Sequence, residues 1–183
     1  MAGSAKGRRL EAPASVTRPT SDRAREGLFS TLEHLLGTLG RKRVLDLYAG
    51  TGAIGLEAAS RGASQVDLVE SDARAIQVCR RNIISLRLPG VSAHALPVEK
   101  WLSSASPTAP YDLIVMDPPY ADSNERIERM LALIMVPGWL ATGGIVAVER
   151  DAKSPEFSWP AGLSQDRERR YGHAVVRYAT KDC

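Results

Sequence analysis

The residues best suited to chemistry stand together as Asp117-Pro118-Pro119-Tyr120, directly after an apolar run at 113–116. A carboxylate that accepts one hydrogen of an exocyclic base amine, beside a backbone carbonyl that accepts the other, draws the nitrogen lone pair out of conjugation with the ring. Prolines suit such a turn because they stiffen it and carry no competing N–H group. The two acceptors would aim the nitrogen at an electrophile, so much of the gain in rate would be positional.

We therefore expect Asp117 to accept a hydrogen bond and to be the candidate proton acceptor, while Pro118 offers its carbonyl. Tyr120 adds an aromatic ring, which can stack on a flipped-out base and contribute about 1–3 kcal/mol. The expected catalytic motif is Asp117, Pro118, Pro119 and Tyr120.

A second candidate site lies upstream, where Gly50, Gly52 and Gly55 follow a short apolar run at 44–48. Glycine is needed where the backbone turns sharply or approaches a ligand closely. This spacing after a strand is typical of a dinucleotide-binding loop, and Glu70 stands at the distance expected for a ribose contact. The loop alone therefore does not separate a nicotinamide dehydrogenase from a methyltransferase.

Two features favour a methyltransferase. Asp46 stands just before the loop, where a carboxylate would repel a pyrophosphate but suits the ammonium and sulfonium groups of S-adenosylmethionine. The motif at Asp117 has no use in a nicotinamide enzyme. A methyl group on a sulfonium is already activated for in-line displacement, so this reaction is expected to need no metal and to leave S-adenosylhomocysteine.

Both motifs fall on a pattern of alternating strands and helices. Apolar runs predict strands at 44–48, 65–69, 91–96, 111–116 and 144–149, with further candidates at 162–165 and 173–180. Periodicity predicts helices at 21–39, 53–60, 73–88, 98–102 and 125–136, and Asp72 is expected to cap the third of these. Such alternation implies a parallel sheet with right-handed crossovers. Ligands bind at the carboxyl edge of such sheets, where both motifs are expected.

Composition limits the class of protein. The chain has 183 residues, 44% hydrophobic and 25% charged, which favours one globular domain with a short appendage. No apolar run approaches the roughly 18 residues of a membrane span, and no secretory signal is recognisable at the N-terminus. Two cysteines, Cys79 and Cys183, argue against a disulfide framework or a zinc cluster. We therefore expect a cytoplasmic protein.

The net charge is +3 and the isoelectric point about 9.0, with the cations gathered near the two ends. The clustered residues are Lys6, Arg8, Arg9, Arg18, Arg23, Arg25, Arg167, Arg169 and Arg170. Clustered cations suit a polyanion, because they displace counterions from phosphates. A solvated tail would carry the same charges, so charge alone leaves nucleic-acid binding open.

Taken together, these residues resemble the bacterial RsmD-type methyltransferases, which methylate the 2-amino group of one guanine in 16S ribosomal RNA. The resemblance covers nearly the whole chain, and its specific parts are Thr17-Arg18-Pro19-Thr20 and Tyr171-Gly172. It also takes in Arg8-Arg9-Leu10, Asp22–Phe29, the loop at 46–55, Glu70-Ser71-Asp72 and the motif at 117–120.

The resemblance implies an α/β fold of the Rossmann-like class I methyltransferase type, a seven-stranded, mostly parallel sheet whose last strand is reversed, with a short N-terminal extension. We expect residues 1–20 to form a flexible basic arm and residues 21–183 to form the S-adenosylmethionine-dependent methyltransferase domain. The implied partner is the 16S rRNA of the small ribosomal subunit. We expect a monomer with no membrane contact.

The expected cofactor contacts follow the first three strands: Asp46, Tyr48, Gly50, Thr51, Gly52, Glu70, Ser71 and Leu96. The expected RNA contacts are Arg8, Arg9, Arg18 and Tyr120. One departure concerns adenine, since many relatives place an Asp after the third strand to accept from its amine. Here His94-Ala95-Leu96-Pro97-Val98 contains no acid, so backbone groups of Leu96 or Val98 are expected to hold the adenine.

Other functions are also compatible with the sequence. A DNA adenine or a protein glutamine methyltransferase uses a related turn, although DNA enzymes usually carry a separate recognition domain, for which this chain leaves little room. Glutamine enzymes favour Asn at the position of Asp117. A non-catalytic RNA-binding module that kept the fold is a further alternative, and its test is whether the cofactor binds.

Overall fold

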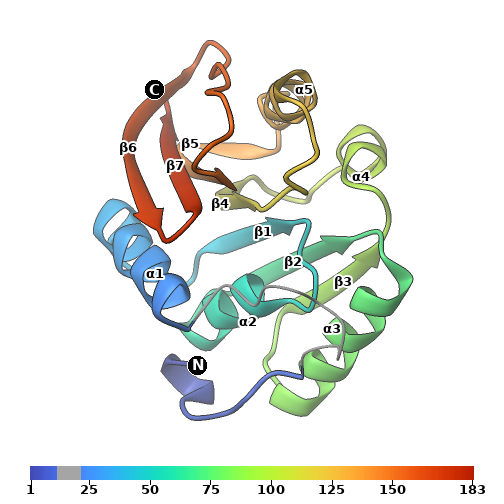
Figure 1. The fold of residues 1–183 in the computed structure, drawn as a ribbon. Coiled ribbons are helices and arrows are strands. Elements are labelled where there is room, and N and C mark those ends of the chain that lie inside the picture. Colours follow the sequence, from blue (N-terminus) through green and yellow to red (C-terminus); the bar gives the residue numbers. More distant parts are fainter. Residues whose placement is uncertain (12–21) are drawn as a thin grey trace.

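The computed structural model describes residues 1–11 and 22–183, in which seven strands form one sheet of order β3-β2-β1-β4-β5-β7-β6 (Figure 1). The strands are β1 (Arg43–Leu47), β2 (Gln65–Glu70), β3 (Val91–Ala95), β4 (Tyr111–Met116), β5 (Leu140–Asp151), β6 (Leu163–Tyr171) and β7 (Ala174–Lys181). The helices are α1 (Asp22–Leu36), α2 (Ala53–Ser60), α3 (Ala73–Leu86), α4 (Val98–Ser104) and α5 (Asn124–Ile134).

Strand direction confirms the fold expected from the sequence. Strands β1 to β5 pair in parallel, as β1 with β2, β1 with β4, β2 with β3 and β4 with β5. The last strand, β7, runs antiparallel to both β5 and β6. The result is the Rossmann-like class I methyltransferase architecture, a mostly parallel sheet with its last strand reversed.

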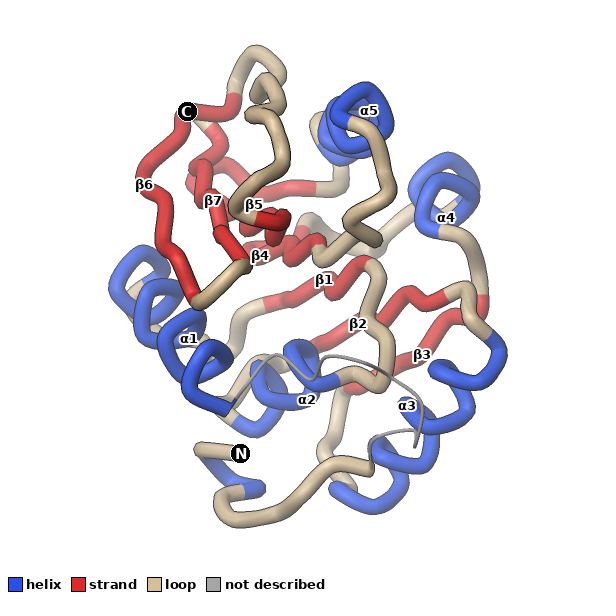
Figure 2. Tube along the Cα trace, in the orientation of Figure 1, coloured by secondary structure: helices blue, strands red, loops and turns tan. Residues whose placement is uncertain are grey.

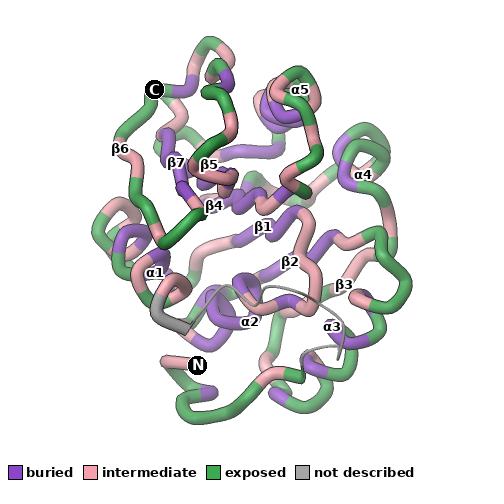
Figure 3. Tube along the Cα trace, viewed as in Figure 1, coloured by how far each residue is buried: buried purple, intermediate pink, exposed green. Residues whose placement is uncertain are grey.

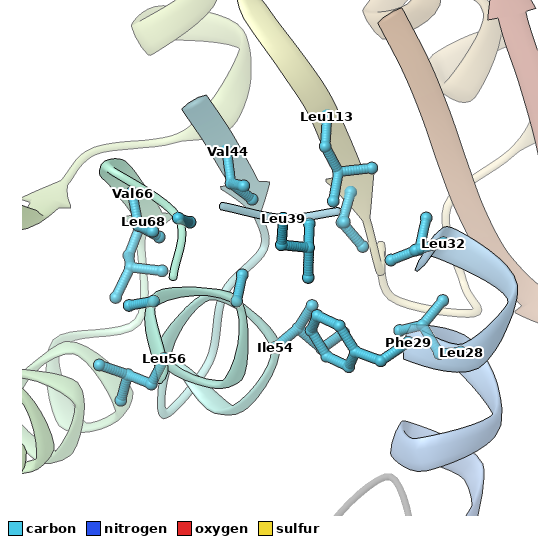
Figure 4. Close-up of a cluster of buried hydrophobic side chains, with 14 of the residues drawn as sticks. Leu28, Phe29, Leu32, Leu39, Val44, Ile54, Leu56, Val66, Leu68 and Leu113 are labelled. Atoms are coloured by element: carbon cyan, nitrogen blue, oxygen red, sulfur yellow. The ribbon is translucent and has the colours of Figure 1, made fainter. Parts of the chain in front are cut away.

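Helices cover both faces of the sheet (Figures 1 and 2). On one face, side chains of α1, α2 and α3 pack on alternate residues of the central strands, such as Val44, Val66 and Leu113 (Figure 4). On the other face, α4 and α5 pack on the intervening residues, such as Leu45 and Ile114. Burial on both faces explains why the central strands read as continuous apolar runs. No helix in the described ranges is long and apolar enough to cross a membrane.

The largest difference from the predicted elements is in the C-terminal strands. β5 begins at Leu140 and ends at Asp151, and β6 spans Leu163–Tyr171, whereas the sequence predicted strands only at 144–149 and 162–165. β6 is an edge strand with mostly exposed or half-buried side chains (Figure 3). Its backbone pairs with β7, so it needs no apolar alternation to form, and the sequence pattern understates its length.

Residues 1–11 of the expected arm lie against α2 and α3. Ala5 is buried, and its N–H donates to the Ser60 hydroxyl over 2.8 Å. The Arg8 guanidinium donates to the carbonyls of Ser85 and Leu86 at the end of α3. The proposed arm boundary at residue 20 falls outside the residues that the structure describes.

Candidate active site

The sheet changes winding direction between β1 and β4, and the two sequence motifs meet at this point. β2 lies on one side of β1 and β4 on the other, so the connections after β1 and β4 leave in opposite directions. Leu47 pairs with Met116, and the N–H of Asp117 donates to the Leu47 carbonyl over 3.4 Å. Open α/β sheets bind their ligands outside the strand ends at such a switch point.

The glycine-rich loop has a left-handed backbone at three positions. Tyr48, Gly50 and Gly52 have φ values of 64°, 55° and 84°. A side chain at such a φ is strained, and strain of this kind clusters at functional sites. The N–H of Gly52 donates to the Ala49 carbonyl over 2.8 Å, and Gly52 is the N-cap of α2. The turn therefore delivers the chain directly from strand to helix.

Each glycine of the loop meets a different environment. A Cβ on Gly55 would press on Leu68 and lie 3.0 Å from Val66 Cγ1, so the third glycine lets α2 pack closely on the sheet. A Cβ on Gly52 would lie 2.9 Å from the Cys79 sulfur. A Cβ on Gly50 would meet no protein atom within 4 Å, so protein packing does not require glycine there, and the space beside it is open to a ligand.

Replacing Gly55 by Ala is expected to lower the free energy of unfolding by about 1–3 kcal/mol, because Leu68 and Val66 must shift within the core. The matched control is Gly50→Ala, where only the strain of a left-handed backbone applies, at about 1–2 kcal/mol. Thermal unfolding followed by circular dichroism measures both. A Tm of Gly55→Ala equal to that of the wild-type protein would contradict the packing role.

Asp46 is buried at the end of β1, and its carboxylate accepts a hydrogen bond from the N–H of Gly55 over 2.8 Å. Burial raises the pKa of Asp46 to about 7; the Gly55 hydrogen bond opposes the rise, while the charges of Asp117 and Glu70 add to it. A buried acid near other acids disfavours its own ionisation. A cation bound beside these acids would therefore be attracted to them and would favour the ionised form of Asp46.

Glu70, at the end of β2, holds the two loops beside it. One carboxylate oxygen accepts from the N–H of Gly50 over 2.8 Å and the other from the N–H of Asp72 over 2.7 Å. Each oxygen retains a second lone pair that can accept from a ligand hydroxyl. Asp72 caps α3 by accepting from the N–H groups of Arg74 and Ala75, which confirms the expected cap.

The acid–proline motif follows β4 directly. Burial raises the pKa of Asp117 to about 6. Pro118 is buried and Pro119 exposed. The Pro119 carbonyl accepts from the N–H of Asp122 over 2.9 Å, which closes a turn with Tyr120 at its first corner. Among the described residues no protein donor reaches the Pro118 carbonyl.

The remaining predicted cofactor contacts follow the first three strands and differ in exposure. Thr51 belongs to the glycine loop, while Ser71 is exposed just beyond Glu70 and Leu96 is half-buried just after β3. The ring of Tyr48 packs against the hydrophobic cluster under α4 and α5, so only its backbone belongs to the loop.

Of the arginines predicted to contact RNA, Arg8 and Arg9 lie on the N-terminal segment that packs against α2 and α3. Arg8 is committed to the end of α3, and Arg9 is exposed on the same N-terminal segment. Arg18 lies outside the described residues. No group of three or more His, Cys, Asp or Glu residues in the described part of the chain is arranged to hold a metal ion.

Two residues that support the site were not singled out by sequence reasoning. The buried Asn82 of α3 donates from its amide to the carbonyls of Thr51 and Glu11, each over 3.1 Å, which joins the glycine loop to the N-terminal segment. The buried Arg150 of β5 reaches the turn after the acid–proline motif. Neither belongs to a recognisable motif, and only the folded arrangement brings them to the site.

Comparison with known proteins finds relatives along nearly the whole chain. The family model described as "Conserved hypothetical protein 95" matches residues 1–180. The "Ribosomal RNA small subunit methyltransferase D" of Escherichia coli K12 is 32% identical over 176 residues, covering 96% of this chain and 85% of that protein. The solved structure of yhhF from Escherichia coli has a TM-score of 0.85 at 29% identity, covering 100% of this chain and 96% of the other.

A more distant solved structure shows the same fold. Magnesium protoporphyrin IX methyltransferase from Synechocystis PCC 6803, with bound SAM, has a TM-score of 0.65 at 16% identity, covering 86% of this chain and 79% of the other. At that identity the likeness concerns the fold alone. The family match and the relative of 32% identity reach further, and they agree with the resemblance seen in the sequence motifs: the chain belongs to the family of the RsmD-type methyltransferases.

Proposed function

We propose that this protein transfers a methyl group from S-adenosylmethionine to the exocyclic 2-amino group of a guanine in the 16S rRNA of the small ribosomal subunit. The observation that carries the proposal is the meeting of the glycine loop after β1 with the Asp117 motif after β4 at the switch point of the sheet. A loop suited to the methyl donor thereby lies beside a pair of acceptors suited to an amine.

The residues at the strand ends fit S-adenosylmethionine. The ligand is cationic at its sulfonium and ammonium groups, and Asp46, Glu70 and Asp117 face one another closely enough to raise the pKa of Asp46. In the described part of the chain no ion pair joins these three acids to a basic side chain. Asp46 and the backbone at Gly50 would hold the methionine part, and Glu70 the ribose hydroxyls. The cofactor would supply an activated methyl group.

The chain's own residues would prepare the amine. The Asp117 carboxylate would accept one hydrogen of the guanine 2-amino group and the Pro118 carbonyl the other, so that the nitrogen lone pair leaves conjugation and points at the methyl group. Tyr120 would stack on the flipped-out base. Asp117 is the candidate acceptor of the proton that the nitrogen loses after transfer.

The substrate class rests on the relatives rather than on the strand ends. The Escherichia coli protein named above is a ribosomal RNA small subunit methyltransferase by name. A polyanion suits the basic residues near both ends, of which Arg9 is exposed. We propose Arg9, Arg18 and Tyr120 as RNA contacts and, since the Arg8 guanidinium is already hydrogen-bonded, only a secondary part for Arg8. A ribosomal substrate would place the activity in the cytoplasm.

The decisive experiment is transfer of a labelled methyl group from S-adenosylmethionine to three substrates, followed by identification of the modified base. The substrates are small ribosomal subunits from cells that lack this activity, purified 16S RNA, and duplex DNA. Label in a guanine 2-methyl product is the expected result, and the ratio of subunit to RNA labelling tells whether an assembled surface is read. Label in DNA adenine or in a subunit protein would replace the proposal with one of its alternatives.

The affinity for S-adenosylmethionine is expected to rise by on the order of 10-fold between pH 5.5 and pH 8. Burial raises the pKa of Asp46 to about 7 and that of Asp117 to about 6, so both acids bind protons at the lower pH, whereas a bound cation favours their ionised forms. Calorimetry in two buffers of different ionisation enthalpy should show proton release near pH 6.5.

The control ligand for this titration is S-adenosylhomocysteine, which lacks the sulfonium charge. Its affinity is expected to change less with pH than that of the methyl donor. An affinity for S-adenosylmethionine that is constant between pH 5.5 and pH 8, with no proton release, would show that the buried acids do not respond to the ligand charge.

A further inference from the structure

Arg150 is a buried cation at the carboxyl end of β5, beside the acid–proline motif. Only 2% of the surface of Arg150 is exposed to solvent. Val148 pairs with Met116 of β4, so Arg150, two residues further along β5, stands level with the first residues after β4. It points to the same face of the sheet as Val148, the face that α4 and α5 cover. Arg150 therefore lies beneath the loop that joins the motif to α5.

The Arg150 guanidinium holds both ends of the turn that contains Tyr120. One terminal nitrogen donates to the Pro119 carbonyl over 3.4 Å and the other to the Asp122 carbonyl over 2.7 Å. The same Pro119 carbonyl accepts from the Asp122 N–H over 2.9 Å. A planar guanidinium presents its donors in a fixed fork, so each terminal nitrogen can hold one carbonyl, whereas an ammonium offers all its donors from a single nitrogen.

Burying the Arg150 charge costs free energy that no ion pair in the described part of the chain offsets. Among the described residues no carboxylate lies within ion-pair distance of Arg150, and its Nε is buried without a partner. A buried charge without a counter-ion carries a large desolvation cost. The other buried arginine of the sheet, Arg177 on β7, instead forms ion pairs with Glu168 and Glu156. The hydrogen bonds of the Arg150 side chain go instead to two carbonyls of a single turn.

We propose that Arg150 is a positioning residue for methyl transfer, a role that rests on the proposed function. By engaging the Pro119 carbonyl it fixes the plane of the peptide that follows Pro119 and directs that oxygen away from the substrate. The Pro118 carbonyl is then left as the acceptor for the amine, and Tyr120 is held at the corner of the turn. Arg150 itself touches neither the cofactor nor the substrate.

The test compares Arg150→Lys and Arg150→Met with Arg177→Lys, a matched change of a buried arginine on the neighbouring strand. We expect the two Arg150 variants to lower kcat by about 10- to 100-fold, with the dissociation constant of S-adenosylmethionine within about threefold of wild type, because the glycine loop is untouched. Arg177→Lys is expected to change Tm but not kcat at a temperature below its unfolding transition.

Two further readouts separate positioning from mere stability. Millimolar methylguanidinium is expected to restore part of the kcat of Arg150→Ala, whereas methylammonium is not, because only a planar fork reaches both carbonyls. Hydrogen exchange of the peptide that spans residues 117–124 is expected to accelerate in Arg150→Lys, without any substrate present. A kcat of Arg150→Met within twofold of wild type, or unchanged exchange in this peptide, would overturn the proposal.

The exchange measurement also keeps the two proposals apart. If the wild-type protein methylates no RNA but exchange at 117–124 accelerates in Arg150→Lys, the proposed substrate is wrong and the clamp on the turn stands. If RNA is methylated and exchange is unchanged, the proposed function stands and the role of Arg150 is wrong.

Discussion

Replacing Asp117 by Ala is expected to lower kcat for methyl transfer by about 10²- to 10⁴-fold, while S-adenosylmethionine still binds. The variant loses the acceptor that would orient the amine and take its proton, but it leaves the glycine loop and Glu70 in place. Single-turnover transfer to the RNA substrate measures the chemical step, and calorimetry measures cofactor affinity. A loss of kcat with affinity within a few-fold of wild type places Asp117 in the chemical step.

The pH dependence gives a second test of the same residue. Burial raises the pKa of Asp117 to about 6 in the ligand-free protein, and the bound cation favours the carboxylate, so kcat of the wild-type protein is expected to fall as pH decreases below this value, where the carboxylate becomes protonated. Asp117→Asn should lose this acidic limb, since an amide does not titrate. Asp166→Ala, at an exposed position on β6, is the control and should keep both the rate and the limb. An Asp117→Ala enzyme with at least a third of the wild-type kcat would exclude the assigned role.

The two motifs could be predicted because their chemistry is local in the sequence. The bounds of α2 and β4 agree with the sequence prediction, since a glycine turn precedes α2 and Asp117-Pro118 ends β4. Proline restricts the residue before it and cannot continue a sheet ladder, so it marks a strand end without tertiary information. The parallel order of the sheet then brings the two motifs to one edge.

The supporting contacts could not be predicted, because they depend on pairing between distant strands. Arg150 reads as the end of a strand, and nothing in its neighbours indicates that it reaches the turn after Pro119. Asn82 reads as a polar residue of α3, but it joins Thr51 to Glu11 across the fold. Charge clustering was also an incomplete guide, since Arg8 binds the carbonyl end of α3.

The polar sequence of β6 led to a predicted strand that was too short at this edge of the sheet. β6 carries Asp166, Arg167 and Glu168 in succession, and the strand predicted from the sequence ended before them, at residue 165. β7 supplies the backbone hydrogen bonds along this segment, and its Thr180 and Arg177 side chains donate to Asp166 and Glu168. Edge strands commonly carry such charges, which oppose pairing with another chain.

Replacing Asp46 by Asn is expected to raise Tm at pH 8 by on the order of 5 °C and to weaken S-adenosylmethionine binding by about 10-fold or more. An Asn oxygen can still accept from the Gly55 N–H, so the variant keeps that contact and loses only the buried charge. The folded pKa of Asp46, about 7, exceeds the ordinary value of 3.8, so the folded state binds the proton more tightly than the unfolded state. Wild-type stability from this group therefore falls as pH rises from about 4 to 7.

The advantage of Asp46→Asn should accordingly shrink as pH falls and be absent near pH 4, where Asp46 is already neutral in the folded protein. Asp67→Asn is the matched control with the opposite sign. Burial raises the pKa of Asp67, but hydrogen bonds from His94, Gln65 and Tyr111 outweigh it and hold that pKa below its ordinary value, so this variant should lose stability at pH 8. An Asp46→Asn protein less stable than wild type at pH 8 would mean that the acid serves the fold. A more stable protein that binds the cofactor weakly would mean that Asp46 is kept for its ligand at the expense of stability.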